Sequence, residues 1–441
     1  MINKNSSKTM KYIITSVQYN ALVNRNFFSN MMKFAKDNGV DKIYAFIQQG
    51  KYRDEQTLHP LLVNNDLIEF VDKKKLNDSL MIFDTKILPQ QIKPFTGMSS
   101  KLSRDYSYIL PSPKIRYLSL ANTSKYPRAL MSTGSLTHGN YKEHTAHGRK
   151  AKAQHQYGFV FVEIENKKIY HAHQIEATKK GDFHYMTTKY HSGKISYSQP
   201  EALVLGDWHT GDTCRKVRKK TIAMLHDLRP KRVVFHDLFN GHSINHHERG
   251  NLLSELRSRK EKRHDLEDEL RMVLKEVQFF AKTFPNVEFL VSESNHDLFL
   301  ERYIQEKRFM EDTENFLLVC RMIPDLLNDG TVLEVALSQV GELPSNFTFL
   351  KEDQTYRVRG VGLDYHGHRG INGSRGSSAS FDRHNLRLIS GHEHTPKLYA
   401  NGMTVGTSTK LKLGYTKGAG SWMNCHGILY ANGKYGLITL L

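Results

Sequence analysis

The sequence has few of the residues that crosslink small or extracellular proteins. Its 441 residues include three cysteines, Cys214, Cys320 and Cys425, which are too few for a disulfide framework or a cysteine-rich zinc site. No run of about 18 apolar residues occurs, so no membrane-spanning segment is expected. The GxxxxGK[ST] pattern of phosphate-binding loops is also missing, which argues against an ATPase. The sequence therefore predicts a cytoplasmic protein with an ordinary hydrophobic core.

Negative charge is scarce in the first part of the chain. Residues 1–200 hold 30 Lys and Arg against 15 Asp and Glu, residues 201–441 hold 33 against 30, and the net charge is +18. A basic part joined to a nearly neutral part suggests a polyanionic partner such as DNA for the first and chemistry for the second. The alternative is a solvated basic surface that binds no partner.

The length and the pattern of apolar residues predict two α/β parts. Residues 1–177 are expected to form a basic accessory domain for DNA binding or assembly, and its residues 11–50 alternate strand, helix and strand. Residues 178–200 are polar and are expected to be a linker. Residues 201–441 form the second domain, in which short apolar strands alternate with helices. Within it, residues 249–283 predict one long charged amphipathic helix, which could support a homo-oligomer.

Five short polar segments follow apolar strands in the second domain. They are GDWHTGD (206–212), HDLFNG (236–241), SNHD (294–297), YHGH (365–368) and GHEH (391–394). The functional loops of an open α/β sheet gather at the carboxyl ends of its strands. These segments can therefore converge although they span nearly 190 residues.

The side chains of these segments form a mixed set of oxygen and nitrogen ligands. The candidates are Asp207, His209, Asp237, Asn295, His366, His392 and His394, with His368 as an alternative to His366. Such ligands suit Mn²⁺, Fe²⁺ or Zn²⁺. They are too many for one ion with an open coordination position, and they suit two divalent ions that share a bridging carboxylate.

The order and wording of the five segments resemble the calcineurin-like metallophosphoesterase superfamily, whose pattern is DxH, GDxxD, GNH[DE], a His after a strand, and GHxH. The resemblance covers roughly residues 200–410. It implies a four-layer α/β/β/α sandwich, here preceded by the basic α/β domain. The basic first part favours the SbcD-type nuclease branch, and the chain also resembles the early DNA-degradation proteins of T5-like bacteriophages. For a phage protein, the cytoplasm would be that of the host cell.

The resemblance implies a role for each matching residue. It implies a first metal held by Asp207, His209, Asp237 and His394, and a second held by Asp237, Asn295, His366 and His392. Asp237 would bridge the two metals, for which Mn²⁺ is favoured. His296 would stabilise the transition state or protonate the leaving oxygen, and Asp297 would orient His296 by a hydrogen bond.

The chain departs from the superfamily pattern at three positions. His236 stands where a Gly usually precedes the bridging Asp, Asn240 stands near the second Asp, and Ser294 replaces the Gly of GNH. None of these changes removes a metal ligand. The repair nucleases also carry a DNA-capping domain after the GHxH segment, whereas 47 residues follow His394 here. A capping role would therefore fall to the N-terminal region or to a second subunit.

These features predict a metal-dependent deoxyribonuclease that degrades host DNA during phage infection, using water activated by two metals. Two alternatives stay open: a phosphomonoesterase acting on a protein or a small molecule, and a non-catalytic DNA-binding scaffold. His242, His246 and His247 could contact substrate phosphate or form a solvated polar loop. The Gly/Ser-rich loop that carries Arg369 and Arg375 could contact the phosphate backbone or be a flexible surface loop. Residues 406–422 could line the same cleft or form an ordinary hairpin.

Overall fold

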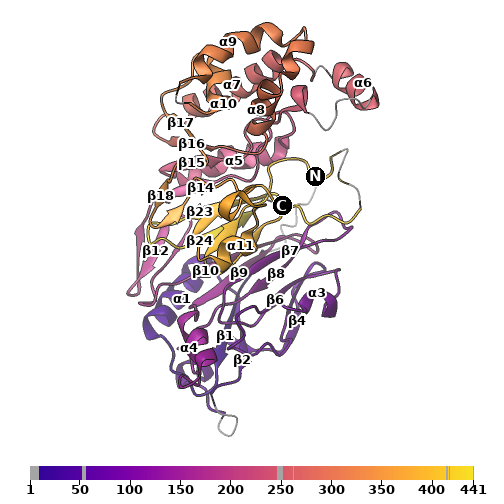
Figure 1. The fold of residues 1–441 in the computed structure, drawn as a ribbon. Coiled ribbons are helices and arrows are strands. Elements are labelled where there is room, and N and C mark those ends of the chain that lie inside the picture. The colour runs from indigo at the N-terminus through magenta and orange to yellow at the C-terminus, as the bar shows by residue number, and fades with distance from the viewer. Residues whose placement is uncertain are drawn as a thin grey trace, which may run out of the picture.

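The computed structural model describes residues 9–51, 56–245, 252–261, 263–328, 330–413, 416 and 418–440. Most of the helices that follow residue 215 gather at one end of the molecule (Figure 1). The N-terminal strands lie at the opposite end, and the late strands of the chain lie between the two.

The N-terminal part opens with the predicted strand, helix and strand. β1 (Met10–Gln18) and β2 (Lys42–Gln48) are parallel neighbours connected by α1 (Arg25–Asn38). The Asn24 side chain accepts a hydrogen bond from the first turn of α1, and Gly39 ends the helix with a φ of 64°; both are common helix-end signals. A five-stranded sheet in the order β10-β9-β1-β2-β3 also contains β3 (Ile68–Phe70), β9 (Gly158–Ile164) and β10 (Tyr170–Glu176).

Residues 178–200, predicted to be a linker, form a small antiparallel sheet instead. Its strands are β11 (Phe183–Tyr185), β12 (Thr188–His191) and β13 (Lys194–Tyr197). The rings of Phe183 and Tyr190 lie 5.9 and 5.3 Å from the ring of Phe34 on α1. The segment is therefore packed into the N-terminal core, although its many polar residues concealed the strand pattern.

The second part is built on a six-stranded sheet in the order β17-β16-β15-β14-β23-β24. Its strands are β14 (Ala202–Val204), β15 (Arg232–Phe235), β16 (Glu288–Ser292), β17 (Phe347–Leu350), β23 (Cys425–Leu429) and β24 (Tyr435–Thr439). β14 to β17 run parallel. Because alternate residues of a strand face opposite sides, Leu203 and Val233 pack in the core that the helices share. Val204 and Val234 pack in the core on the other face.

A ten-stranded sheet crosses the predicted boundary between the two domains. Its order is β18-β19-β20-β22-β21-β7-β8-β6-β5-β4. The early strands are β4 (Lys73–Lys75), β5 (Leu80–Phe83), β6 (Ser107–Leu110), β7 (Tyr117–Leu120) and β8 (Arg128–Ser132). The late strands are β18 (Arg357–Val358), β19 (Val361–Gly362), β20 (Leu388–Ser390), β21 (Lys397–Leu398) and β22 (Gly402–Thr404). The antiparallel pairing of β7 with β21 joins the two sets, and one buried cluster contains side chains of both parts.

The helices of the second part form the core on the outer face of the six-stranded sheet. They are α5 (Arg215–Leu228), α7 (Leu266–Thr283), α8 (Asp297–Gln305), α9 (Phe316–Leu326) and α10 (Val332–Ser338). The described residues of α6 (Leu252–Lys260) do not belong to this core, and its leucines are exposed. Shorter helices elsewhere are α2 (Pro60–Val63), α3 (Met98–Lys101), α4 (Ala146–Ala153) and α11 (Ser378–Arg383), with 3-10 turns at His242–Ile244, Arg308–Glu311 and Ile371–Gly373.

The prediction of one long helix over residues 249–283 is wrong, because the described part of this range forms α6 and α7. Asp265 marks the break, since its carboxylate accepts a hydrogen bond from the N–H of Asp268 at 2.9 Å and caps α7. Residues 249–251 and 262 lie outside the described residues.

The predicted mixed α/β class is confirmed, with helices on one face of the six-stranded sheet and the shared core on the other. The finer four-layer description stays a prediction. Within the ranges that the structure describes, no helix combines the length and the apolar character that a bilayer crossing needs.

Candidate metal centre

The loops at the ends of five strands supply the candidate metal ligands. Asp207 follows β14, Asp237 follows β15 and Asn295 follows β16, and these strands are parallel neighbours whose carboxyl ends share one edge. His366 and His392 follow β19 and β20 of the ten-stranded sheet. The ligands therefore meet where the two sheets adjoin.

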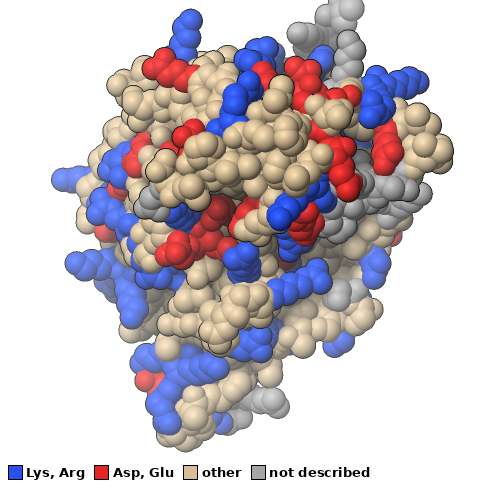
Figure 2. Space-filling view, turned by 45° about the horizontal axis from the view of Figure 1, so that its top comes forward, with Lys and Arg blue, Asp and Glu red and all other residues tan. Residues whose placement is uncertain are grey.

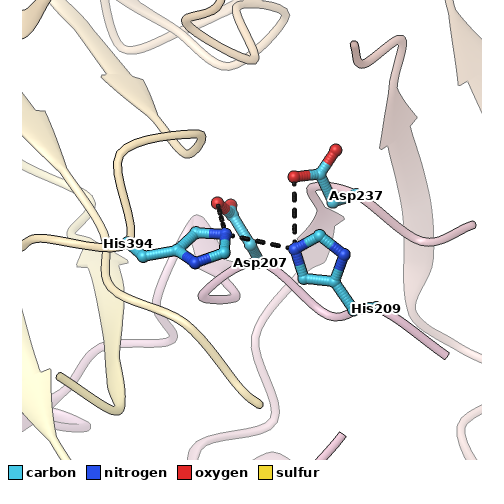
Figure 3. Close-up of side chains that lie close together, drawn as sticks. All are labelled: Asp207, His209, Asp237 and His394. Carbon is cyan, nitrogen blue, oxygen red and sulfur yellow. Dashed lines mark hydrogen bonds and ion pairs between the residues drawn. The ribbon is translucent and has the colours of Figure 1, made fainter. Parts of the chain in front are cut away.

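Four buried side chains form the first group of ligand atoms. One ligand atom from each of Asp207, His209, Asp237 and His394 lies within 4.8 Å of the others. Nε2 of His394 is 3.0 Å from Oδ2 of Asp207 and 3.1 Å from Nε2 of His209 (Figure 3). That nitrogen of His209 is in turn 3.4 Å from Oδ2 of Asp237. The four side chains point toward one another from three separate loops.

A second group of ligand atoms adjoins the first through Asp237. The other carboxylate oxygen of Asp237, Oδ1, is 3.4 Å from Nε2 of His366. Oδ1 of Asn295 is 2.9 Å from the same nitrogen and 2.9 Å from Nδ1 of His392. Asp237 therefore faces a different donor group with each of its oxygens, as a bridging carboxylate does.

The buried polar atoms of the site fit a bound cation. Both carboxylate oxygens of Asp207 and Oδ1 of Asp237 are buried and have no hydrogen-bond partner among the described residues. Burial raises the pKa of both carboxyl groups, and it lowers the pKa of His209 and His366 well below the usual histidine range. A divalent cation offsets buried negative charge and binds imidazole in its neutral form. The residues present therefore fit a metal that prefers mixed oxygen and nitrogen ligands.

Backbone strain is concentrated at the ligand positions. His209, Asp237, His392 and His394 have φ values between 47° and 70°, a left-handed conformation that costs non-glycine residues about 1–3 kcal/mol each. The N–H of His209 donates to the carbonyl of Asp237 at 2.7 Å and holds two of these strained loops together. Contacts elsewhere in the fold therefore enforce the convergence of these side chains.

The glycine before His392 permits a close approach of the backbone to the first group. A Cβ at Gly391 would lie 2.1 Å from Oδ1 of Asp207 and 2.8 Å from the ring of His236. His236 is fully buried, and its ring lies 5.5 Å from the ring of His366. The departure from the superfamily pattern at His236 therefore adds buried packing behind the ligands and displaces none of them.

His296 lies beside the first group, and a backbone carbonyl orients its ring. The ring lies 4.7 Å from that of His209, and Nδ1 donates a hydrogen bond to the carbonyl of Asn240 at 2.6 Å. Because Nδ1 carries this hydrogen, Nε2 is the atom that can exchange a proton with a substrate. Asp297 does not orient His296 as predicted. Its Oδ2 accepts a hydrogen bond from the N–H of Ser294 at 2.8 Å, because Asp297 opens α8 and its side chain folds back over the preceding loop.

The chain is similar to Protein A1 of Escherichia phage T5. The two are 28% identical over an alignment 468 positions long, which covers 97% of this chain and 81% of that protein. The predicted relationship to a T5-like protein is thereby confirmed.

No family model matches the chain, and the superfamily assignment stays a prediction. Two crystal structures of Chaetomium thermophilum Vps29, one of them complexed with the cyclic peptide RT-D3, align with 40% of this chain and 94% of their own. Their sequence identities are 9% and 6%, and the TM-score is 0.23 for both. A TM-score this low does not establish a shared fold.

The segment after His366 contributes a charged wall beside the second group. Nε2 of His368 is 3.6 Å from Oε1 of Glu352, and Nη1 of Arg369 is 2.9 Å from Oε2 of the same side chain. Exposed Arg375 pairs with Arg369 through a short antiparallel bridge. A cavity of about 330 Å³ beside the second group is lined by Asn295, Leu298, Phe299, Arg302, His368, Arg369 and His392.

His242, predicted to contact substrate, is held in an ion-pair network. Its Nε2 is 2.8 Å from Oδ2 of Asp212 and 3.1 Å from Nη1 of Arg263. Burial alone would lower the pKa of His242, but the hydrogen bond and the charge of Asp212 raise it above its ordinary value. The other two predicted contacts of this loop, His246 and His247, lie outside the described residues.

Two features of the site, the carbonyl of Asn240 and the side chain of Arg302, were not predicted from the sequence. The role of the Asn240 carbonyl could not have been predicted, because a backbone acceptor does not depend on the residue type. Arg302 could have been predicted, since it lies on the helix that begins at the last residue of the SNHD segment. Trp422, whose ring lies 4.3 Å from that of His394, belongs to the stretch 406–422, for which the sequence left open a place in the same cleft or an ordinary hairpin.

Proposed function

We propose that this chain is a metal-dependent phosphodiesterase that hydrolyses DNA. The observation that carries the proposal is the carboxylate of Asp237, whose two oxygens each lie 3.4 Å from an imidazole of a different donor group. Two divalent ions held in this way would activate a water molecule and neutralise charge on the phosphate under attack. We assign the site to the calcineurin-like metallophosphoesterase superfamily, and Mn²⁺ is the ion that we propose.

Each of the two groups of ligand atoms would form one metal position. The first ion would be held by Asp207, His209, Asp237 and His394, and the second by Asp237, Asn295, His366 and His392. Both groups are rich in neutral imidazole and contain no thiolate, which suits the proposed ion class.

With both ring nitrogens protonated, His296 would donate its Nε2 proton to the leaving oxygen and return to the neutral form with Nδ1–H. Its hydrogen bond to the carbonyl of Asn240 fixes the orientation of the ring and leaves Nε2 for this transfer. A positioned general acid contributes about 10²–10⁴-fold to a rate. Asp297 has a different role, because its bond to the N–H of Ser294 fixes the loop that carries Asn295 and His296.

The positive charge of this chain favours a polymeric phosphodiester as the substrate over a small phosphomonoester. Residues 1–200 carry twice as many Lys and Arg as Asp and Glu. Figure 2 shows basic and acidic side chains mixed in the upper part of the view, and few acidic ones in the lower part. Arg302 and Arg369 line the cavity at the second donor group, where they can contact backbone phosphates. We propose the cytoplasm of a phage-infected cell as the place of action, because the similar protein is from a phage.

Hydrolysis assays on one preparation test the proposal. The protein is stripped with EDTA, reloaded with Mn²⁺, and assayed on linear DNA, circular DNA, bis-p-nitrophenyl phosphate and p-nitrophenyl phosphate. We expect hydrolysis of DNA and of the small diester. Asp237→Asn should reduce both rates by more than the about 10–100-fold that loss of an outer hydrogen-bond partner of a metal ligand costs. The matched control is Asp72→Asn at an exposed position.

The same assays discriminate the alternatives. Hydrolysis of p-nitrophenyl phosphate with both diesters intact would favour a phosphomonoesterase. Binding of DNA without hydrolysis under Mn²⁺, Mg²⁺ and Zn²⁺ would favour a scaffold. Equal activity of Asp237→Asn and wild type would remove the bridging carboxylate from the mechanism.

A further inference from the structure

A cavity lies between the N-terminal and C-terminal parts of the chain, beside the metal centre. Its volume is about 630 Å³, and its described lining residues come from 122–127 in the first part and from 411, 412, 416 and 418–422 in the second. Among the described residues that line it are Lys125, Lys412 and Trp422, and none of those lining residues is an Asp or a Glu. The cavity therefore combines positive charge with an aromatic surface.

Hydrogen bonds between the two loops fix the shape of this cavity. Asn122 and Gly420 exchange backbone hydrogen bonds at 3.1 and 3.0 Å. The hydroxyl of Ser119 on β7 donates to the carbonyl of Ser421 at 2.7 Å. The N-terminal part is thus attached directly to the loop that forms the other wall.

Trp422 connects the cavity to the first donor group. Its half-buried ring meets the ring of His394 edge to face, with centroids 4.3 Å apart and an angle of 69°. The N–H of the next residue, Met423, donates to the carbonyl of His394 at 3.2 Å. A ligand in the cavity is therefore separated from the metal ligands by a single side chain.

The chemistry of the lining identifies the kind of ligand. Exposed lysines bind backbone phosphates, and an indole stacks with any base that is unpaired, whatever its sequence. Basic grooves with aromatic stacking surfaces are typical of proteins that bind single strands. In a duplex, the faces of the bases are already stacked on their neighbours.

We propose that this cavity binds unpaired nucleotides of a DNA strand next to the scissile phosphate, an inference that rests on the proposed function. Lys125 and Lys412 contact the phosphates, and a base stacks on Trp422. The strand runs from the cavity with Arg302 and Arg369 at the second donor group, across the metal centre, to the N-terminal part. Residues 122–127 of the basic first part thereby become a component of the substrate track.

Tryptophan fluorescence tests this placement. The chain has two tryptophans, and Trp208 is fully buried, so quenching by a bound base reports on Trp422. The full chain is titrated with a dT₁₂ oligonucleotide and with a hairpin duplex of equal length, in EDTA, so that no hydrolysis occurs. We expect saturable quenching by dT₁₂ that is lost in Trp422→Phe and is weaker with the duplex.

Salt dependence tests the two lysines. A single strand contributes about 0.7 to the slope of log affinity against log salt for each neutralised phosphate. Lys125→Ala/Lys412→Ala should therefore make the slope shallower by about 1.4. The control Lys167→Ala/Lys168→Ala, on the exposed β9–β10 turn, should leave the slope unchanged.

The possible results distinguish failure of the proposed binding site from failure of the proposed nuclease function. Quenching that persists in Trp422→Phe, equal quenching by the duplex, or an unchanged slope in the Lys125/Lys412 variant would overturn the inference. DNA cleavage by wild type together with any of these results would leave the proposed function standing. Specific quenching without DNA cleavage under Mn²⁺ would support the binding site and contradict the nuclease.

Discussion

The backbone carbonyl of Asn240 orients the side chain of His296 for the proposed proton transfer. The ring of His296 belongs to neither donor group, and its hydrogen bond to the carbonyl of Asn240 engages Nδ1 and leaves Nε2 for the proton transfer. His296→Ala should therefore lower kcat for DNA by about 10²–10⁴-fold with bound Mn²⁺ unchanged. Steady-state kinetics and metal analysis on the same sample check both parts.

A control at the half-buried His191 of β12, His191→Ala, should keep wild-type kcat. Loss of Mn²⁺ together with activity in His296→Ala would instead make His296 a metal ligand.

Lys114 is a buried lysine outside the metal centre, and it predicts a pH dependence of stability. Its ammonium has no exposed surface and donates to the carbonyl of Pro89 and the hydroxyl of Tyr141. Burial, and then the charge of Arg116, lowers the pKa of Lys114 from 10.5 to about 7. Between these values the unfolded chain binds more protons than the folded chain, so stability rises with pH.

The stability of wild type minus that of Lys114→Met should therefore increase by up to about 1.4 kcal/mol per pH unit between pH 7 and pH 10. Urea denaturation at each pH measures the difference. A difference that is flat across this range would mean that Lys114 stays charged in the folded protein.

At the scale of elements, Asp265 separates α6 from α7. Its carboxylate caps the first turn of α7, whose buried face includes Leu270, Val273 and Val277. Asp265→Ala should cost about 1 kcal/mol of stability, whereas Asp265→Asn should cost almost nothing, because Asn is an equally good N-cap. Chemical denaturation of the two variants checks the difference, and equal losses would contradict the capping role.

Local elements could be predicted from the sequence, but long-range pairing could not. The strand–helix–strand opening and the β9–β10 hairpin follow from apolar periodicity and from end signals such as Gly39, which act over a few residues. The pairing of Lys397 with Leu118 leaves no such signal, because a strand of two residues has no detectable period. The strands within 178–200 were missed for a related reason, since Phe183 and Tyr190 are buried among polar neighbours.

The candidate ligands could be named because each stands directly after an apolar strand. The partner of His296 could not be named, because Asn240 contributes its main chain. The predicted partner of Asp297 was wrong. Its position next to His296 in the sequence does not determine where its side chain points at the start of a helix.

At the scale of the whole molecule, the ten-stranded sheet makes the two parts interdependent. A fragment of residues 198–441 lacks β4 to β8, and it would expose Ile389, Leu398 and Met403 of the shared core. We expect the full chain to unfold in one cooperative transition and the fragment to bind a hydrophobic dye without one. Calorimetry and dye fluorescence check this, and a fragment that melts cooperatively would restore the predicted domain boundary.

Asp207 and His394 are far apart in the sequence, and this separation determines when the metal centre can form during translation. β14 pairs with β23, and β7 pairs with β21, so neither large sheet can close while the ribosome still holds the last strands. The nascent polypeptide therefore emerges with its metal-binding loops apart. Whatever chemistry the centre performs begins only after His394 and the strand β23 have left the ribosome.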